Sequence, residues 1–222
     1  MVEAMRVVRS DDPAIAASEL LVEAISRVPD APRLAIPGGS AVAALGPTRE
    51  KLGRAWAHVR LTWVDERCVP LADAESNRGS AYRAGALDAD APPALELPLF
   101  LDGETGAEAV ARVESALDRG FGGALDVLLL GMGEDGHVAS LFPGRETAGA
   151  RVAHVTASPK PPPERITLTR SFLGTAGETI LLAAGESKRA ALSRLLRGDA
   201  TLPAQGLAGL AVVTDLVVGD AK

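Results

Sequence analysis

The segment LDVLLLGMGEDGHVASLFPG places an aspartate two residues before a histidine on a glycine-rich loop. The loop follows an apolar run typical of a buried strand, so Asp135 and His137 are expected at the carboxyl end of that strand. An unperturbed imidazole titrates near neutral pH, and a neighbouring carboxylate can fix its tautomer or stabilise its protonated form. We therefore predict that His137 transfers protons, supported by Asp135. His58 and His154 have no comparable setting and are interpreted as structural or surface residues.

The same loop contains GMGEDG at 131–136, which matches the G-x-G-x-x-G pattern of dinucleotide-binding loops. The residue types disagree with that function, because Glu134 and Asp135 would repel a pyrophosphate and Pro143 arrives too early for the helix that should follow. The acidic ribose ligand is also missing, since 150–159 contains no Asp or Glu. The sequence therefore predicts no dinucleotide cofactor, and we expect Gly133 to lie against a different substrate.

A second charged group, in WVDERCVP, follows the strand expected at 60–65. Ligands of open α/β sheets bind outside the carboxyl ends of the strands, so the three charged residues Asp65, Glu66 and Arg67 are placed for chemistry, with Asp65 and Arg67 as candidates for substrate contact. The alternative is a salt-bridged surface turn. Further along, Ser76 is expected to cap a helix, and the amide of Asn77 could reach the same site.

The segment IPGGS combines a strand end with two glycines and a serine. Gly38 and Gly39 would let the backbone approach a ligand closely. Ser40, as the N-cap of the next helix, would leave free N–H groups directed at an anion. An ordinary strand-to-helix turn is the alternative interpretation of this segment.

Three cations, Lys160, Arg165 and Lys188, lie beside other predicted strand ends. A phosphate monoester carries about −1.5 to −2 charge near pH 7, and a protein of net charge −6 needs local cations to bind one. Each cation alone is more often a solvated surface charge. Together they favour an anion site.

Short runs rich in Val, Leu and Ile alternate with longer segments of helical spacing, a pattern typical of a mostly parallel sheet covered on both faces. The expected strands are 5–10, 33–37, 60–65, 125–131, 151–157, 164–169, 178–185 and 210–215. The expected helices are 13–28, a stretch after Gly39, 106–121 and 186–198. The Pro-rich loops at 88–98 and 158–164 are too short to be interdomain linkers, so we predict a single α/β domain over residues 1–222.

The residue counts exclude several functional classes. With 29 acidic and 23 basic residues, the chain has no general electrostatic attraction for nucleic acid or an anionic membrane. Cys68 is the only cysteine, which precludes an intramolecular disulfide, and we interpret it as a small hydrophobe. No run approaches the roughly 18 apolar residues of a membrane span, and no Cys/His spacing indicates a metal site. We expect a cytoplasmic monomer or small homo-oligomer without metal.

The segment GMGEDGHVASLFPG closely resembles the G-x-G-x-D-G-H-x-A-S-L-F-P pattern of the 6-phosphogluconolactonase family, and WVDERCVP…SN resembles that family's D-E-R-x-V-P…S-N segment. PGGS, SPKPPPERITLT and GESK follow in the family's order, so the resemblance covers about 33–196. It implies a Rossmann-like three-layer α/β/α sandwich of the NagB/RpiA/CoA-transferase-like type, shared with glucosamine-6-phosphate deaminase. It also implies that neither a metal nor a nicotinamide cofactor is needed.

The resemblance implies hydrolysis of a small-molecule substrate, 6-phospho-D-glucono-1,5-lactone, to 6-phosphogluconate. His137 would activate water with the support of Asp135, and Arg67 would position the substrate or stabilise the oxyanion. The remaining substrate contacts are expected at Gly38, Gly39, Ser40, Asp65, Asn77, Gly133, Lys160, Arg165 and Lys188, with the phosphate at the glycine turn and the cations.

The sequence departs from the family at two places. Ala41 and Val42 stand where the family's G-G-S turn usually continues with Thr-Pro, which removes a hydroxyl from the expected phosphate pocket. DAE at 73–75 stands where a histidine is common.

Two alternative functions remain open from the sequence. A glucosamine-6-phosphate deaminase or aldose–ketose isomerase usually continues after the histidine with an A-F-N-E-P-like run carrying a catalytic Glu, whereas this chain has ASLFPG. A non-catalytic sugar-phosphate sensor would need an output module, and the sequence has no evident helix-turn-helix segment or basic arm.

Overall fold

A seven-stranded parallel sheet forms the centre of the molecule. The computed structural model describes residues 5–218, so the ends of the predicted domain, 1–4 and 219–222, lie outside the described residues. All neighbouring strands of the sheet pair in parallel, which confirms the predicted fold class. In spatial order the strands are β1 (Arg6–Arg9), β10 (Leu210–Thr214), β9 (Glu178–Leu182), β6 (Val127–Gly131), β2 (Arg33–Ile36), β3 (Arg60–Trp63) and β5 (Leu95–Leu97).

The strand order reverses direction between β2 and β6. The chain continues from β2 to β3 on one side and from β6 to β9 on the other, although β2 and β6 are hydrogen-bonded neighbours. Connections that leave adjacent strands in opposite directions open a crevice at the carboxyl ends of those strands. The loops after Ile36 and Gly131 meet at this crevice.

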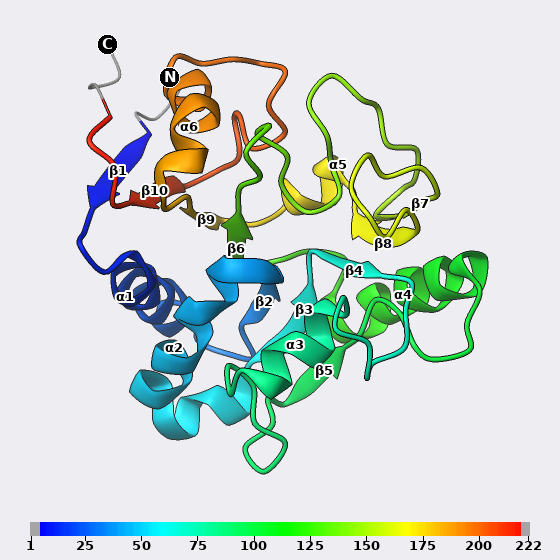
Figure 1. The fold of residues 1–222 in the computed structure, drawn as a ribbon. Coiled ribbons are helices and arrows are strands. Elements are labelled where there is room, and N and C mark those ends of the chain that lie inside the picture. The colour runs from blue at the N-terminus through cyan, green and yellow to red at the C-terminus, as the bar shows by residue number, and fades with distance from the viewer. Residues whose placement is uncertain (1–4, 219–222) are drawn as a thin grey trace.

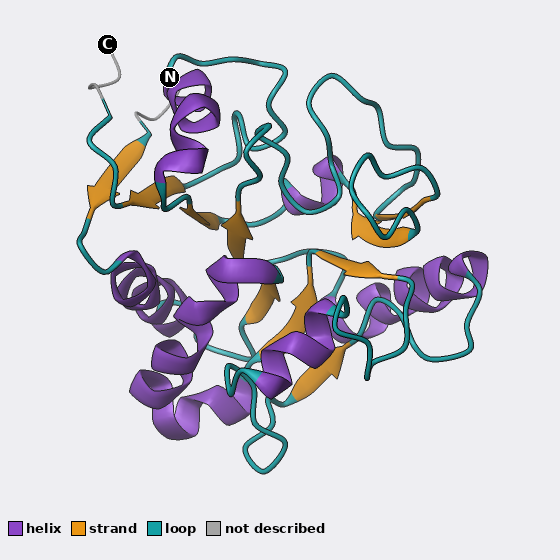
Figure 2. Ribbon diagram, viewed as in Figure 1, coloured by secondary structure: helices purple, strands orange, loops and turns teal. Residues whose placement is uncertain are grey.

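Helices cover both faces of the sheet, with α1 and α2 on one side and α4 and α6 on the other (Figures 1 and 2). The described α-helices are α1 (Pro13–Ser26), α2 (Leu45–Leu52), α3 (Asn77–Arg83), α4 (Gly106–Phe121), α5 (Arg170–Leu173) and α6 (Arg189–Leu196), and the 3₁₀ segments are η1 (Gly39–Ala44), η2 (Gly53–His58) and η3 (Glu186–Lys188). Within residues 5–218, none of these helices has the length and apolar character that a membrane span requires.

Helix α4 shows why the predicted bounds at 106–121 are correct. Thr105 and Glu108 form a reciprocal capping box at its start, and Gly122 ends it in the left-handed conformation. Val113 and Leu117, spaced by four residues on one face, are fully buried. Local capping and amphipathic spacing agree in this helix.

A second sheet contradicts part of the strand prediction. β4 (Asp65–Arg67), β8 (Arg165–Leu168) and β7 (Val152–Val155) form a separate antiparallel sheet, so the strands expected at 151–157 and 164–169 do not belong to the main sheet. The connection at 156–164 is too short for the crossover that parallel pairing requires, and it suits an antiparallel pair.

Other differences are local. The strand expected at 60–65 ends at Trp63, and the chain then enters β4. The edge strand β5 was not predicted, because its three residues lie inside a Pro-rich loop. The helix expected at 186–198 begins as the 3₁₀ segment η3 and becomes α-helical only at Arg189.

Leu129 lies at the middle of the central strand β6 and is fully buried. We expect Leu129→Ala to lower the free energy of unfolding by about 2–5 kcal/mol, because truncation leaves a cavity that the sheet cannot close. Leu101→Ala is the matched control, since Leu101 is 38% exposed and its truncation should change stability by less than about 0.5 kcal/mol. Urea unfolding followed by circular dichroism measures both; equal losses would contradict the assignment of Leu129 to the core.

Candidate active site

A cavity of ≈ 300 Å³ opens at the crevice between β2 and β6. It is lined by the segments that follow β2, β6 and β9, together with β4 and β8 of the small sheet. Eleven of the twelve residues predicted to act at the site line this cavity: Gly38, Gly39, Ser40, Asp65, Arg67, Asn77, Gly133, His137, Lys160, Arg165 and Lys188. The twelfth, Asp135, contacts His137.

His137 and Asp135 form a close pair at the cavity wall. The Nδ1 atom of His137 lies 2.5 Å from Oδ1 of Asp135, and the His137 backbone N–H donates to the same oxygen at 3.3 Å. Burial raises the pKa of Asp135, but the hydrogen bond and charge of His137, with Lys160 4.0 Å away, outweigh burial and leave that pKa below its ordinary value. An ionised Asp135 favours a proton on Nδ1 and leaves the lone pair of a neutral imidazole on Nε2.

Gly133 makes room for this pair. A Cβ atom at position 133 would lie 2.0 Å from Nδ1 of His137 and 2.7 Å from Oδ1 of Asp135. Gly136 has φ = +92°, which favours glycine, and its N–H donates to the Gly133 carbonyl at 3.0 Å. The glycines of GMGEDG therefore shape a turn that holds the His–Asp pair. In the described chain no helix follows this turn before Arg170.

The carboxylate of Asp65 joins three separate segments around the cavity. It is 5% exposed and accepts hydrogen bonds from Ser140 Oγ at 2.7 Å and from Asn77 Nδ2 at 3.2 Å. Nη1 of Arg165 lies 3.8 Å from the carboxylate. Sequence reasoning missed Ser140, although it belongs to the ASLFP run directly after His137.

Glu66 organises the start of α3. Its buried carboxylate accepts from the backbone N–H groups of Arg67, Asn77 and Arg78 at 2.7–2.8 Å. Burial raises the pKa of Glu66, and these donors partly offset that effect. The predicted capping role of Ser76 is confirmed, since its side chain accepts from the Gly79 N–H at 3.0 Å. These contacts fix where Asn77 enters the cavity wall.

The guanidinium of Arg67 is only partly satisfied within the described structure. Its Nη1 donates to the Glu75 carbonyl at 2.6 Å, whereas its buried Nε has no hydrogen-bond partner. Nη1 also lies 3.6 Å from the Glu75 carboxylate. Because Arg67 lines the cavity, its guanidinium lies beside the space that an oxygen-bearing ligand would fill.

The glycine turn differs from the prediction at Ser40. Gly38, not Ser40, is the N-cap of η1, and no side chain caps this segment, so the N-cap prediction for Ser40 is wrong. The N-cap lies two residues earlier than predicted, and Gly39, the first residue of η1, has φ = +66°. Gly38 is also required sterically, since a Cβ there would lie 1.9 Å from Oδ1 of Asn77.

The three predicted cations all line the cavity, but they differ in burial and in how far hydrogen bonds fix their side chains. Arg165 is 3% exposed, and its Nε and Nη2 donate to the carbonyls of residues 160–162, so its orientation is fixed. Burial lowers the pKa of Arg165, and the charge of Asp65 opposes that shift. Lys160 and Lys188 are partly exposed. Of these three cations, Arg165 is held rigidly and the two lysines are more exposed.

Comparison with known proteins identifies the family. Residues 9–214 match the family model described as glucosamine-6-phosphate isomerases/6-phosphogluconolactonase. The chain belongs to this family. The 6-phosphogluconolactonase of Mycobacterium leprae (strain TN) is 40% identical over 171 residues, covering 70% of this chain and 68% of that protein.

Solved structures of the glucosamine-6-phosphate isomerase/6-phosphogluconolactonase family share the fold. The 6-phosphogluconolactonase from Trypanosoma cruzi superposes with a TM-score of 0.80 at 25% identity, covering 96% of this chain and 95% of that one. A monomeric glucosamine-6-phosphate deaminase superposes with a TM-score of 0.77 at 20% identity, covering 95% and 96%. Since both kinds of enzyme have this fold, the residues of the cavity must distinguish them.

The contact between Gly133 and the His–Asp pair generates a prediction about tautomers. In the unaltered protein, neutral His137 should carry its proton on Nδ1, and Gly133→Ala should raise the Nε2–H population because the added methyl displaces the ring or the carboxylate. ¹⁵N NMR of the three histidines measures the tautomer directly. Gly46→Ala is the control, since a Cβ at that position meets open space. Unchanged His137 nitrogens in Gly133→Ala would refute this steric role.

Proposed function

We propose that this chain is a 6-phosphogluconolactonase, which hydrolyses 6-phospho-D-glucono-1,5-lactone to 6-phosphogluconate in the pentose phosphate pathway. The observation that carries the proposal is an imidazole held by a carboxylate through Nδ1, at the wall of a cavity that four cationic side chains, including Arg67, also line. Relatives named 6-phosphogluconolactonase at 40% and 38% identity support the same activity.

His137 is the general base in this mechanism. Nε2 takes a proton from a water molecule as the water oxygen attacks C1 of the lactone, and Asp135 stabilises the imidazolium that forms. The tetrahedral intermediate then collapses with cleavage of the bond between C1 and the ring oxygen. The proton on Nε2 passes to that oxygen, and the product acid ionises in solution. No covalent intermediate with the protein is needed, because a lactone is a reactive ester.

Arg67 is placed to stabilise negative charge on the carbonyl oxygen. Its guanidinium lines the same cavity as His137, and a preformed donor at the developing oxyanion lowers the barrier. Asp65 and Asn77 are hydrogen-bonded to each other in the cavity wall. We assign them the positioning of the sugar ring and its hydroxyls.

The phosphate binds at the glycine turn with Lys188, Arg165 and Lys160. Support comes from the local excess of positive charge in a protein of net charge −6 and from the short side chains of the Gly38–Ser40 turn. Binding energy at this end of the substrate orients the reacting carbon at the other end.

The direct test is disappearance of the lactone, followed by coupled detection of 6-phosphogluconate above the uncatalysed rate. Glucosamine 6-phosphate is the control substrate, assayed for release of ammonia. We expect turnover of the lactone only. Turnover of glucosamine 6-phosphate, or of neither compound, would contradict the proposed function.

Removal of the base should abolish most of the activity. We expect His137→Ala to lower kcat by about 10²- to 10⁴-fold, the usual contribution of a general base, while binding of 6-phosphogluconate persists. His58→Ala is the matched control, because His58 is exposed and does not line the cavity. Steady-state kinetics and product titration measure both effects; full turnover in His137→Ala would remove His137 from the mechanism.

Removal of a cationic side chain that binds the substrate phosphate should weaken substrate binding and leave the chemical step unchanged. We expect Lys188→Ala to raise KM about tenfold to a hundredfold with little change in kcat, because a charged hydrogen bond remote from the reacting carbon contributes uniformly to binding. Lys51→Ala is the control, since Lys51 pairs with Glu19 away from the cavity. An unchanged KM would exclude Lys188 from the phosphate site without affecting the proposed reaction.

A further inference from the structure

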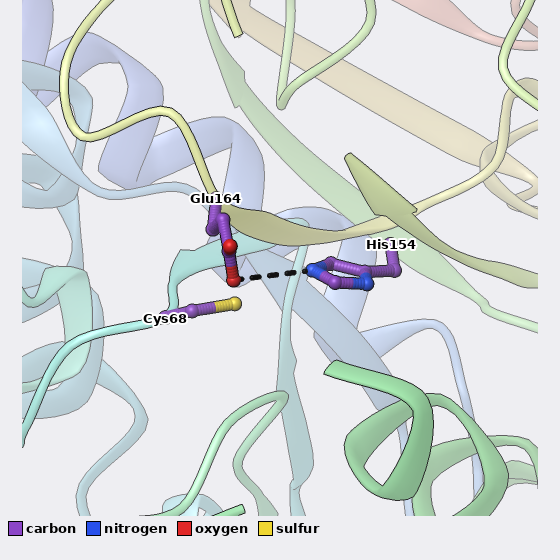
Figure 3. A group of neighbouring side chains, drawn as sticks. All are labelled: Cys68, His154 and Glu164. Carbon is purple, nitrogen blue, oxygen red and sulfur yellow. Dashed lines mark ion pairs between the residues drawn. The ribbon is translucent and has the colours of Figure 1, made fainter. Parts of the chain in front are cut away.

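A second group of reactive side chains lies outside the catalytic cavity. Cys68, His154 and Glu164 each offer one potential ligand atom, and these atoms all lie within 4.8 Å of one another. Figure 3 shows the Cys68 sulfur and the His154 ring both directed toward the Glu164 carboxylate. None of the three lines the catalytic cavity. Their sequence separation conceals the group from any search by spacing.

The register of the small sheet brings these residues together. The Cys68 N–H donates to the Glu164 carbonyl at 3.0 Å, which extends the pairing of β4 with β8, and His154 of β7 pairs with Ile166 of β8. Because side chains alternate along a strand, Cys68, His154 and Glu164 project from one face of this sheet. Arg67 and Arg165, their chain neighbours, project from the opposite face into the cavity.

The imidazole of His154 is held in place but lacks a hydrogen bond. Its Nε2 is buried without a hydrogen-bond partner in the described structure, and it lies 3.5 Å from Oε2 of Glu164. The ring packs directly over Gly106 at the start of α4, where a Cβ would lie 2.4 Å from Nε2. The contact with Glu164 is an ion pair only when the ring is protonated, and it is longer than an ordinary hydrogen bond, so a neutral ring leaves this buried nitrogen without a hydrogen-bond partner in the described structure.

The donor set and its spacing fit a zinc ion. Tetrahedral Zn²⁺ binds thiolate, imidazole and carboxylate ligands at about 2.0–2.3 Å, which places two ligand atoms about 3.3–3.6 Å apart. The Nε2–Oε2 separation of 3.5 Å already meets this requirement. Glu164 is exposed and Cys68 partly exposed, so small rotations of these side chains would close the remaining distances.

The thiol is not poised as a nucleophile. Burial, with the charges of Glu164 and Glu66, raises the pKa of Cys68 to about 12, so the side chain is a neutral thiol near pH 7. A bound metal ion stabilises the thiolate and displaces the thiol proton to solvent.

We propose that Cys68, His154 and Glu164 bind one Zn²⁺ ion, with water in the fourth position, on the face of the small sheet opposite the catalytic cavity. The ion links β7 to the residue after β4 and the residue before β8, and so stiffens the strands that carry Arg67 and Arg165. This role is structural, and it does not depend on the proposed hydrolysis.

The test is titration of the chelator-treated, dialysed full-length protein with ZnCl₂ by calorimetry, in parallel with thermal unfolding. We expect one ion per chain and a higher Tm with Zn²⁺. Cys68→Ser and His154→Gln should each weaken binding by at least about tenfold and remove the rise in Tm. His58→Gln, an exposed histidine outside the group, should bind as the unaltered protein does.

Two further measurements keep the proposal falsifiable if a variant folds poorly. In the unaltered protein Zn²⁺ should slow the reaction of a thiol reagent with Cys68, the only cysteine, and Co²⁺ should give thiolate-to-metal charge-transfer absorption. Absence of both effects would overturn the proposal. It would also fail if His137→Gln alone abolished Zn²⁺ binding, because the ion would then occupy the catalytic cavity.

Discussion

The buried carboxylate of Asp65 is the group on which the cavity depends. It binds Ser140 from the loop that carries His137, Asn77 from the start of α3 and Arg165 from β8. Removing it would leave the buried Arg165 charge without its carboxylate partner, which is more costly than losing an exposed ion pair. One acidic side chain thus couples the position of the catalytic loop to that of the small sheet. The other contacts of the cavity depend on these two positions.

The parallel sheet explains how an acidic protein presents a basic pocket. The reversal between β2 and β6 brings several loops to one edge, so cations that are distant in sequence converge there while the acidic surplus is distributed elsewhere. Lys160 and Lys188 come from different connections, and neither is distinguishable in the sequence from a solvated surface lysine. Net charge therefore describes the whole molecule and says little about the field inside the cavity.

Short-range features were predictable from the sequence, whereas contacts between distant segments were not. The His137–Asp135 pair and the bounds of α4 follow from local spacing and capping. The bond between Ser140 and Asp65 joins residues 75 positions apart and has no local signal. Strand pattern alone also could not assign β7 and β8 to a second sheet, since the alternation of side chains along a strand does not identify its pairing partner. The predicted Ser40 cap was wrong because η1 already begins at Gly39.

The contact between Gly38 and Asn77 has an evolutionary consequence. Because the two residues occupy space that only one side chain can fill, neither position can vary independently of the other. A side chain larger than hydrogen at position 38 is tolerated only after the residue at position 77 has become smaller or has moved. Once position 77 holds a small residue, selection no longer maintains glycine at position 38. Substitutions at these positions should therefore show strong epistasis, with the order of the two changes deciding whether the intermediate protein functions.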